Sequence, residues 1–288
     1  FTPQNIADLL EYQVQVGFAY KGLPPEQIKE ILADLINEVK TRLFSLPVSE
    51  WNAILDATTK NLDNKQIVLY SSNQQIEEVF TSVGWGGRVL PRTTDVQMVV
   101  DANLASLKTD PVVDRSITYQ LGRNLNGDWV GRTTVRYEHT GSLDWKTTRY
   151  RTYTRLYVPV GTKFVGSQGS LLNDATQNPS GAVGPVDVGE DLGLAVFGAF
   201  ISIEPGKTGE LIFEYLLDDS VVEAIEDGFY DLTVYKQLGS RDHALTLDLD
   251  FDKTVTHATP AEDQGEWGDD TFLLNTILDQ DHVLSVEL

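Results

Sequence analysis

The stretch "DANLASLKTD", residues 101–110, carries side chains that could do chemistry. Asn103, Lys108 and Asp110 lie among small apolar residues, and a lysine at such a place could hold a phosphate as a point charge. The structural alternative is that Lys108 pairs with Asp101 or Asp110, while Asn103 caps a turn by bonding to nearby backbone. The residue types favour the structural interpretation. Arg88 and Arg92, just upstream, complete the set of candidate binding residues.

A second stretch, "RYRTYTRLYVPVG", alternates arginine and tyrosine. In a strand, Arg149, Arg151, Tyr153, Arg155 and Tyr157 would share one face. Such a face could bind nucleic acid by charge and stacking. The alternative is a sheet face whose arginines pair with acidic residues of a neighbouring strand, with cross-strand packing. The strongly acidic balance of the whole chain favours the second interpretation, and we expect no nucleic-acid partner.

Two acidic stretches could bind a hard cation such as calcium. In "LTLDLDFD", Asp248, Asp250 and Asp252 alternate with apolar residues, but a straight strand cannot wrap an ion. "EDQGEWGDD", residues 262–270, is more loop-like, yet it does not match the EF-hand pattern. A solvated acidic face explains both stretches better. We therefore predict no metal site and no cofactor, with weak calcium binding as an open alternative.

Catalytic signatures are absent from the sequence. The four histidines are scattered without an HExxH pattern, and neither GxSxG nor a phosphate-binding glycine pattern occurs. The lack of cysteine excludes disulfides, zinc–thiolate sites and thiol catalysis. We predict no catalytic residue in this chain.

The chain has 288 residues and a formal net charge of −21, which is unevenly distributed. Residues 91–169 carry 11 basic and 7 acidic groups, whereas residues 170–288 carry 4 basic and 25 acidic groups. A surface this acidic repels nucleic acid and anionic lipid. No run of apolar residues is long enough to span a membrane. Because the chain begins with Phe1, we expect a processed product or a fragment, with any membrane anchor upstream.

The elements that must position these groups fall into two regions. Residues 1–90 show mainly helical periodicity, with helices predicted in 1–13, 23–46, 48–62 and 73–84 and a buried strand in 65–72. Residues 91–288 change to a period of two with frequent turn residues, which predicts an antiparallel β-sandwich. Strands are predicted within 95–103, 112–123, 128–141, 147–161, 194–206, 209–218, 230–240, 243–251, 270–278 and 282–288. The Gly- and Pro-rich segment 167–193 is predicted to be a long loop. The fold class is α+β, a helical and βα segment followed by a large sandwich.

The order of motifs along the chain resembles the bacterial family called domain of unknown function 4012. The resemblance is carried by "FTPQNIADLLEYQ", "KQIVLYSSNQQIEEVFTSVGWGGRV", "TDVQMVVDANLASLKTDPVVDRSITYQL", "TVRYEHTG", "YRTYTRLYVPVGTKFVGSQG", "FGAFISIEPG" and "YDLTVYKQLGS". It implies an extracytoplasmic protein with one N-terminal membrane anchor and an upstream domain similar to the LytR–CpsA–Psr phosphotransferases. The present chain would be the C-terminal half of such a protein.

Two functions follow as expectations. The first is a non-enzymatic structural or interaction module of a bacterial cell-surface protein, with protein partners or self-assembly at the envelope. The second is an accessory half of an envelope glycopolymer phosphotransferase, in which Arg88 or Lys108 would face the polymer. The second function needs an apolar tunnel beside free cations, so the structure around Arg88, Arg92 and Lys108 bears on the choice.

Overall fold

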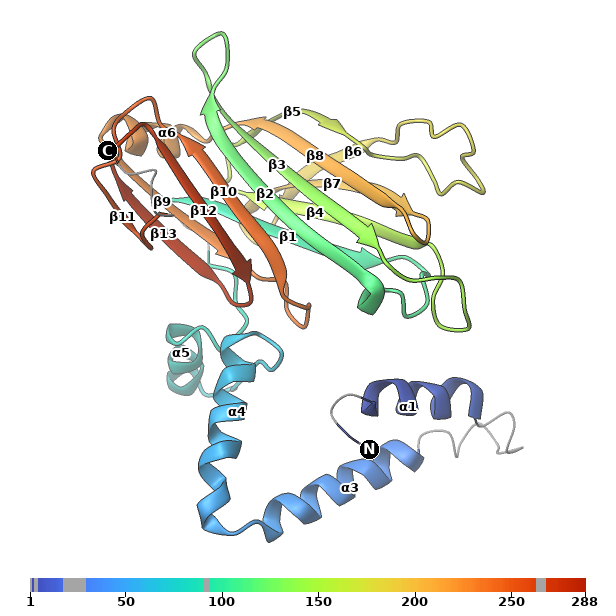
Figure 1. Cartoon of the computed structure of the whole chain (residues 1–288). Helices are drawn as coiled ribbons and strands as arrows, with labels where there is room; N and C mark the ends of the chain where they lie inside the picture. Colours follow the sequence, from blue (N-terminus) through green and yellow to red (C-terminus); the bar gives the residue numbers. More distant parts are fainter. Residues whose placement is uncertain (1, 3–4, 18–29, 91–93, 263–267) are drawn as a thin grey trace. The chain divides into compact units, whose positions relative to one another are not determined.

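The computed structural model describes residues 2, 5–17, 30–90, 94–262 and 268–288. The chain divides into two compact units, 1–60 and 61–288. None of the helices in the described residues combines the length and the apolar character that a membrane crossing requires. The fold is α+β, with most of the helices at the N-terminal end and a large β-sandwich after them (Figure 1).

The first unit is helical. It contains α1 (Ile6–Tyr12), a π-helical turn (Gln13–Gly17), α3 (Glu30–Ser45), a 3-10 turn (Val48–Glu50) and most of α4 (Trp51–Asp63). The helices predicted in these segments are confirmed where the residues are described. The beginning of the second predicted helix lies outside the described residues.

Residues 61–90 belong to the second unit. Asn73 caps α5 (Gln74–Ser82) because its side-chain oxygen accepts hydrogen bonds from the amides of Gln75 and Ile76. Gly84, with a φ of +78°, follows the end of this helix, as predicted.

The prediction of a strand at residues 65–72 is wrong. Residues 67–70 have no regular secondary structure, and the Val68 and Tyr70 side chains are exposed. The amide of Ile67 donates to Asn61 at the end of α4, and the amide of Leu69 donates to Trp85. An apolar run becomes a strand only when a neighbouring strand takes up its backbone groups, and here helix ends and turns take them up instead.

The sandwich consists of two sheets. The seven-stranded sheet has the order β11-β13-β9-β1-β4-β7-β6, and the six-stranded sheet has the order β12-β10-β2-β3-β8-β5 (Figure 1). Most pairs are antiparallel, but β1 pairs with β9 and β2 with β10 in parallel. The strands are β1 (Asp95–Asn103), β2 (Val113–Arg123), β3 (Trp129–His139), β4 (Tyr150–Val158), β5 (Lys163–Gln168), β6 (Val186–Asp191), β7 (Leu194–Ile203), β8 (Thr208–Leu216), β9 (Phe229–Tyr235), β10 (His243–Asp250), β11 (His257–Thr259), β12 (Thr271–Leu278) and β13 (His282–Glu287).

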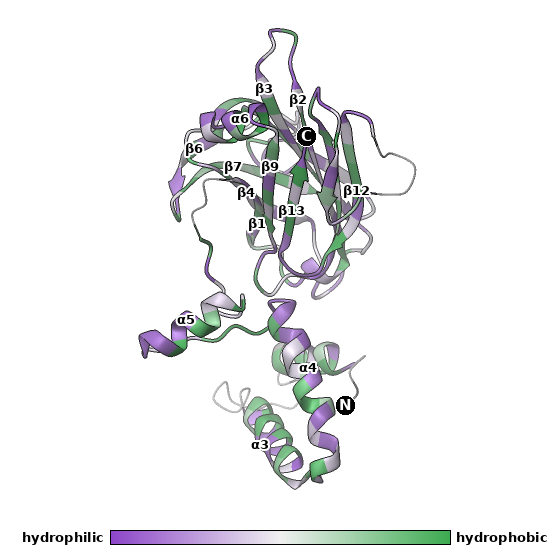
Figure 2. Cartoon of the chain, turned by 90° about the vertical axis from the view of Figure 1, so that its left-hand side faces the viewer, coloured by the Kyte–Doolittle hydropathy of each residue, from purple (hydrophilic) through white to green (hydrophobic). Residues whose placement is uncertain are grey.

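The core lies between the two sheets. Hydrophobic and hydrophilic residues alternate along the strands (Figure 2), so that one face of each sheet is apolar. Fully buried aromatic side chains from both sheets, among them Tyr119, Phe197, Phe213 and Phe251, belong to one continuous cluster. A helix, α6 (Asp219–Glu226), adds Val221 and Ile225 to this cluster. Burial of this apolar surface is the main contribution to the stability of the sandwich.

The segment 167–193 is more regular than predicted. β6 occupies residues 186–191, and an isolated bridge joins Leu171 to Val183. Gly169 has a φ of +84°, and a Cβ atom there would lie 1.8 Å from the carbonyl oxygen of Glu210. Only glycine fits at this point, where the chain leaves β5 next to β8.

Candidate functional site

The stretch 101–110 contains the end of β1 and the loop that leads to a 3-10 turn (Asp110–Val112). The side-chain oxygen of Asn103 accepts a hydrogen bond of 2.8 Å from the Ser106 amide. The nitrogen of the same side chain donates to the Asp110 carboxylate at 2.6 Å and to the Leu107 carbonyl at 3.3 Å. The prediction that Asn103 caps a turn is confirmed, and Asp110 is its partner.

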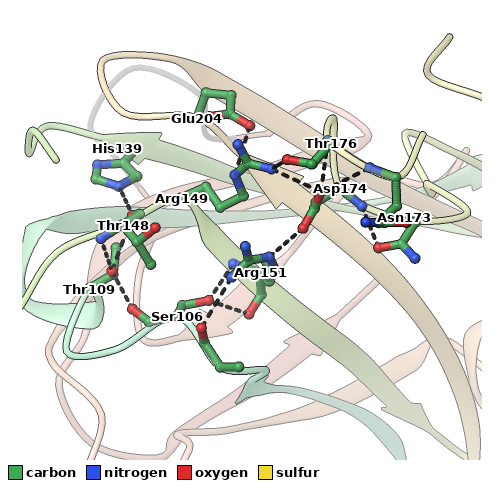
Figure 3. Close-up of polar contacts among 12 residues, drawn as sticks. Ser106, Thr109, His139, Thr148, Arg149, Arg151, Asn173, Asp174, Thr176 and Glu204 are labelled. Atoms are coloured by element: carbon green, nitrogen blue, oxygen red, sulfur yellow. Dashed lines mark hydrogen bonds and ion pairs between the residues drawn. The ribbon is translucent and has the colours of Figure 1, made fainter. Parts of the chain in front are cut away.

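Ser106 and Thr109 attach this loop to the beginning of β4. The Ser106 hydroxyl donates to the Arg151 carbonyl at 3.0 Å and accepts from the Arg151 amide at 2.6 Å (Figure 3). The Thr109 hydroxyl accepts from the Thr148 amide at 3.0 Å. Both side chains are fully buried, so these bonds fix the loop against the sheet.

The arginines at the beginning of β4 hold the 170–184 segment. One Asp174 oxygen lies 2.9 Å from Nη1 of Arg149, and the other lies 2.6 Å from Nε of Arg151 (Figure 3). Glu204 lies 3.2 Å from Nε of Arg149. The bond from Arg151, helped by backbone amides and Arg149, holds the pKa of Asp174 well below its usual range.

Two tyrosines further along β4 also face acidic residues. Tyr153 donates to Asp187, and Tyr157 donates to Asp191 at 3.0 Å. Arginines and tyrosines of the alternating stretch therefore bond to acidic groups of this chain. The arginine partners differ from the predicted ones, because Asp174 lies in the segment between β5 and β6 and Glu204 follows the end of β7, so neither lies on a neighbouring strand.

The predicted pairing of Lys108 is wrong. Its side chain is exposed, and no ion pair involves it in the described part of the chain. Asp101 pairs with Arg115 instead, and Asp110 bonds to Asn103. Arg88, which follows α5, lies 3.3 Å from a Glu77 oxygen. Arg92 lies outside the described residues. Of the predicted site residues, the structure brings Asn103 and Asp110 into direct contact.

The sequence reasoning missed Arg115. Nη1 of Arg115 on β2 donates to Oδ2 of Asp101 on β1 at 2.6 Å, which links the two sheets. Oδ1 of Asp101 accepts from the hydroxyls of Tyr137 and Thr154, each at 2.7 Å. Gln237 bonds to both members of the pair: its Oε1 accepts from the Asp101 amide at 3.0 Å and from Arg115 at 3.3 Å. Burial and the Asp101 charge raise the pKa of Tyr137 far above its ordinary value, so Tyr137 stays a neutral donor.

A pocket of about 310 Å³ opens beside this pair. Its walls come from both sheets and from the turn 237–241 between β9 and β10. The lining includes Asp110, Pro111, Arg115, Tyr150, Leu238 and His243. Burial, followed by the positive charges of Arg115, Lys236 and Arg241, lowers the pKa of His243 to about 3. His243 is therefore a neutral imidazole at pH 7.

A second pocket, of about 340 Å³, is mainly apolar. Met98, Val100, Tyr157 and Tyr235 form its walls, together with Lys65 and Lys236. Both lysines have partners, because Lys65 pairs with Asp281 and Lys236 donates to the Asn64 carbonyl at 2.9 Å and lies 3.3 Å from Asp242. Neither Arg88 nor Lys108 lines either of these two pockets.

The acidic strand β10 has the predicted alternation. Leu247, Leu249 and Phe251 are buried, whereas Asp250 and Asp252 are exposed. Asp252 lies 3.0 Å from Arg123. Within the described ranges, no group of three or more histidine or acidic side chains could hold a metal ion. Residues 263–267 of the predicted calcium loop lie outside those ranges.

Comparisons with known proteins give only distant likenesses. No protein-family model matches the chain, and no curated protein matches it. A candidate nutrient binding protein from Legionella pneumophila shares 12% identity, with a TM-score of 0.36, over 66% of this chain and 72% of its own. An M1 zinc metallopeptidase from Deinococcus radiodurans shares 10% identity, with a TM-score of 0.26, over 64% of this chain and 43% of its own. Likenesses of this size do not establish a shared fold.

Proposed function

We propose that this chain is a non-enzymatic interaction module of a bacterial cell-surface protein, and that it associates through the edge strand β12. The observation that carries the proposal is the contrast between β12 and the other sheet edges. A strand at an edge presents unpaired backbone groups, and proteins usually protect such edges with charges, bulges or short strands.

Three edges of the sandwich have such protection. β11 has only 3 residues. β5 is interrupted by a register shift between Phe164 and Gly166. β6 carries Asp187, Glu190 and Asp191. A second strand would meet poor geometry or negative charge at each of these edges.

The fourth edge has none of these features. β12 is 8 residues long, its sequence TFLLNTIL has no charged residue, and it pairs with β10 without a register shift. Ile277 on this strand is 58% exposed. On its other side no strand pairs with it in the described part of the chain. Such an edge is suited to the addition of a strand from another chain.

A second copy of this chain is the first partner to test. Two β12 strands can pair antiparallel about a two-fold axis, which gives a closed dimer. The net charge of −21 opposes this association, so added salt should strengthen it. The resemblance to an extracytoplasmic family and the acidic composition support the surface location.

The alternative, an accessory half of an envelope glycopolymer phosphotransferase, has weaker support. It needs free cations beside an apolar cavity. The lysines at the apolar pocket have partners in this chain, and Arg88 lies beside Glu77. We therefore favour the interaction module.

Sedimentation velocity over a concentration series tests the association, with the full chain at low and high sodium chloride. We expect reversible self-association that increases with salt and is lost in Ile277→Lys. The matched control is Val283→Lys on β13, which is 56% exposed but lies on a strand paired on both sides. A wild-type chain that stays monomeric at all concentrations, or equal loss in both variants, would refute the role of the edge. Labelling of intact cells with a membrane-impermeant amine reagent tests the location, and labelling only after lysis would contradict it.

A further inference from the structure

Arg115 is only partly used by the contacts described so far. It lies on the inward-facing side of β2, between Val113 and Ile117, and only 4% of its side chain is exposed. Its Nη1 donates to Asp101 and Gln237. Its Nε and Nη2 are buried and have no hydrogen-bond partner among the described residues. Buried donors on a group that is always charged are costly to leave unpaired.

The two remaining donors have a defined geometry. In a guanidinium group, the N–H bonds of Nε and Nη2 lie on one edge and point in parallel. This fork matches the two oxygens of a carboxylate and can hold them with two parallel hydrogen bonds. Arg115 thus has one nitrogen bonded to its partner across the sheets and one complete edge of unpaired donors, and it lines the 310 Å³ pocket.

We propose that this pocket binds a small molecule through its carboxylate group, held by Nε and Nη2 of Arg115. The inference goes beyond the proposed function, because it concerns a small ligand and residues other than those of the β12 edge. Pro111, Tyr150 and Leu238 line the pocket and would contact the body of the ligand. The volume lies at the lower end of the range for small-molecule sites, about 300–1,000 Å³.

The charges around the fork favour a carboxylate over a phosphate. Asp101 already lies 2.6 Å from Nη1 of Arg115, and Asp110 also lines the pocket. A dianion would therefore add two negative charges beside these carboxylates, whereas a carboxylate adds one, and the cations that line the pocket with them are Arg115 and Arg241.

Access to the fork requires a local rearrangement. Both nitrogens are covered in the structure, so a ligand must displace the atoms that cover them. The turn 237–241 is a wall of the pocket, and Gly239 within it has a φ of +68°. We expect the backbone amide signals of this turn to shift together with the Arg115 Nε–H signal.

Nuclear magnetic resonance of the ¹⁵N-labelled full chain tests the proposal, because the Nε–H of a buried arginine gives its own signal. Sodium benzoate and sodium glucuronate are the probes, with benzamide, glucose and sodium phosphate as comparisons at constant ionic strength. Arg115→Lys assigns the signal and keeps a positive charge toward Asp101 while removing the fork. Arg123→Lys is the matched control, since Arg123 lies on the same strand and pairs with Glu226 and Asp252.

We expect a saturable shift of the Arg115 signal with at least one carboxylate and none with the neutral compounds. Binding should weaken about tenfold or more in Arg115→Lys and stay unchanged in Arg123→Lys. No saturable shift with either carboxylate, equal shifts with benzamide, or binding of phosphate alone would overturn the proposal. If Arg115→Lys fails to fold, the contrast between benzoate and benzamide on the wild-type chain still shows whether the pocket recognises a carboxylate. The Ile277→Lys result is independent of all these outcomes.

Discussion

Asp95, at the beginning of β1, allows the effect of a buried carboxylate on the free energy of unfolding to be measured. Its side chain lies between the two sheets and is almost fully buried. Oδ2 accepts hydrogen bonds of 2.6 Å from the hydroxyls of both Tyr119 and Tyr230, and Oδ1 accepts one of 2.8 Å from the Val96 amide. Burial outweighs these bonds and raises the pKa of Asp95 from 3.8 to about 6.

This shift has a definite sign and size. Because the folded state holds its proton more tightly than the unfolded state, Asp95 stabilises the fold most below pH 4. That contribution is lost as the pH rises through about 6. At about 1.4 kcal/mol for each pKa unit, the whole change is about 3 kcal/mol. In Asp95→Asn an amide nitrogen in the place of Oδ2 can donate to both tyrosine oxygens while the amide oxygen still accepts from Val96, and the side chain has no charge to lose.

The measurement is urea unfolding of the full chain between pH 4 and pH 8, followed by the β-sheet signal in circular dichroism. We expect the unfolding free energy of the wild type, relative to Asp95→Asn, to fall by roughly 2–2.5 kcal/mol over this range, because Asp95 of the unfolded chain is already partly ionised at pH 4. The steepest change should lie between pH 4 and 6. Asp114→Asn, which removes a carboxylate that is 65% exposed on β2, is the control, and the difference between it and the wild type should not change in this way with pH. A difference between wild type and Asp95→Asn that is constant with pH would refute the reasoning.

Two further predictions concern charged residues of the candidate site. Lys108→Ala should change the unfolding free energy by no more than about 0.5 kcal/mol, because its side chain is exposed; a larger loss in urea unfolding would mean that it has a partner. Asp174→Asn should cost about 1–3 kcal/mol at pH 7, since Arg149 and Arg151 lose their shared acceptor. The pKa of Asp174 is lowered in the fold, so this cost should shrink as the pH falls below about 4. A cost that does not change with pH would contradict the ion pairs.

The strands that sequence alone could predict are those with one buried face. β2 shows why, since Val113, Ile117, Tyr119 and Leu121 recur every second or fourth residue and all face the core. β5, β6 and β11 were not predicted. β6 is almost entirely exposed, and β11 has only 3 residues. Edge strands of this kind are set by backbone pairing with a neighbour, which leaves little trace in the pattern of side chains.

The candidate site was predicted only where its contacts are local. The bonds of Asn103 join residues up to 7 positions apart, and turn chemistry predicts such contacts. The pair Asp101–Arg115 depends on how two sheets face each other, which no local pattern encodes. One feature of the sequence could have identified Arg115, however. Arg115 has the same parity along β2 as Val113 and Ile117, so strict alternation places a permanent positive charge inside the sandwich.

The charge imbalance along the chain has a structural counterpart. Arg132 and Arg136 on β3 lie directly opposite Glu214 and Glu210 on β8, each pair at 2.9 Å. The basic middle of the sequence thus meets part of the acidic C-terminal half within one sheet.

Exposed pairs of this kind contribute little stability individually, but they reduce the self-repulsion that composition alone implies. The acidic groups of β6 have a different consequence. At an edge, negative charge opposes pairing with another acidic chain, so in the proposed self-association the distribution of charge disfavours β6 and favours the uncharged strand β12.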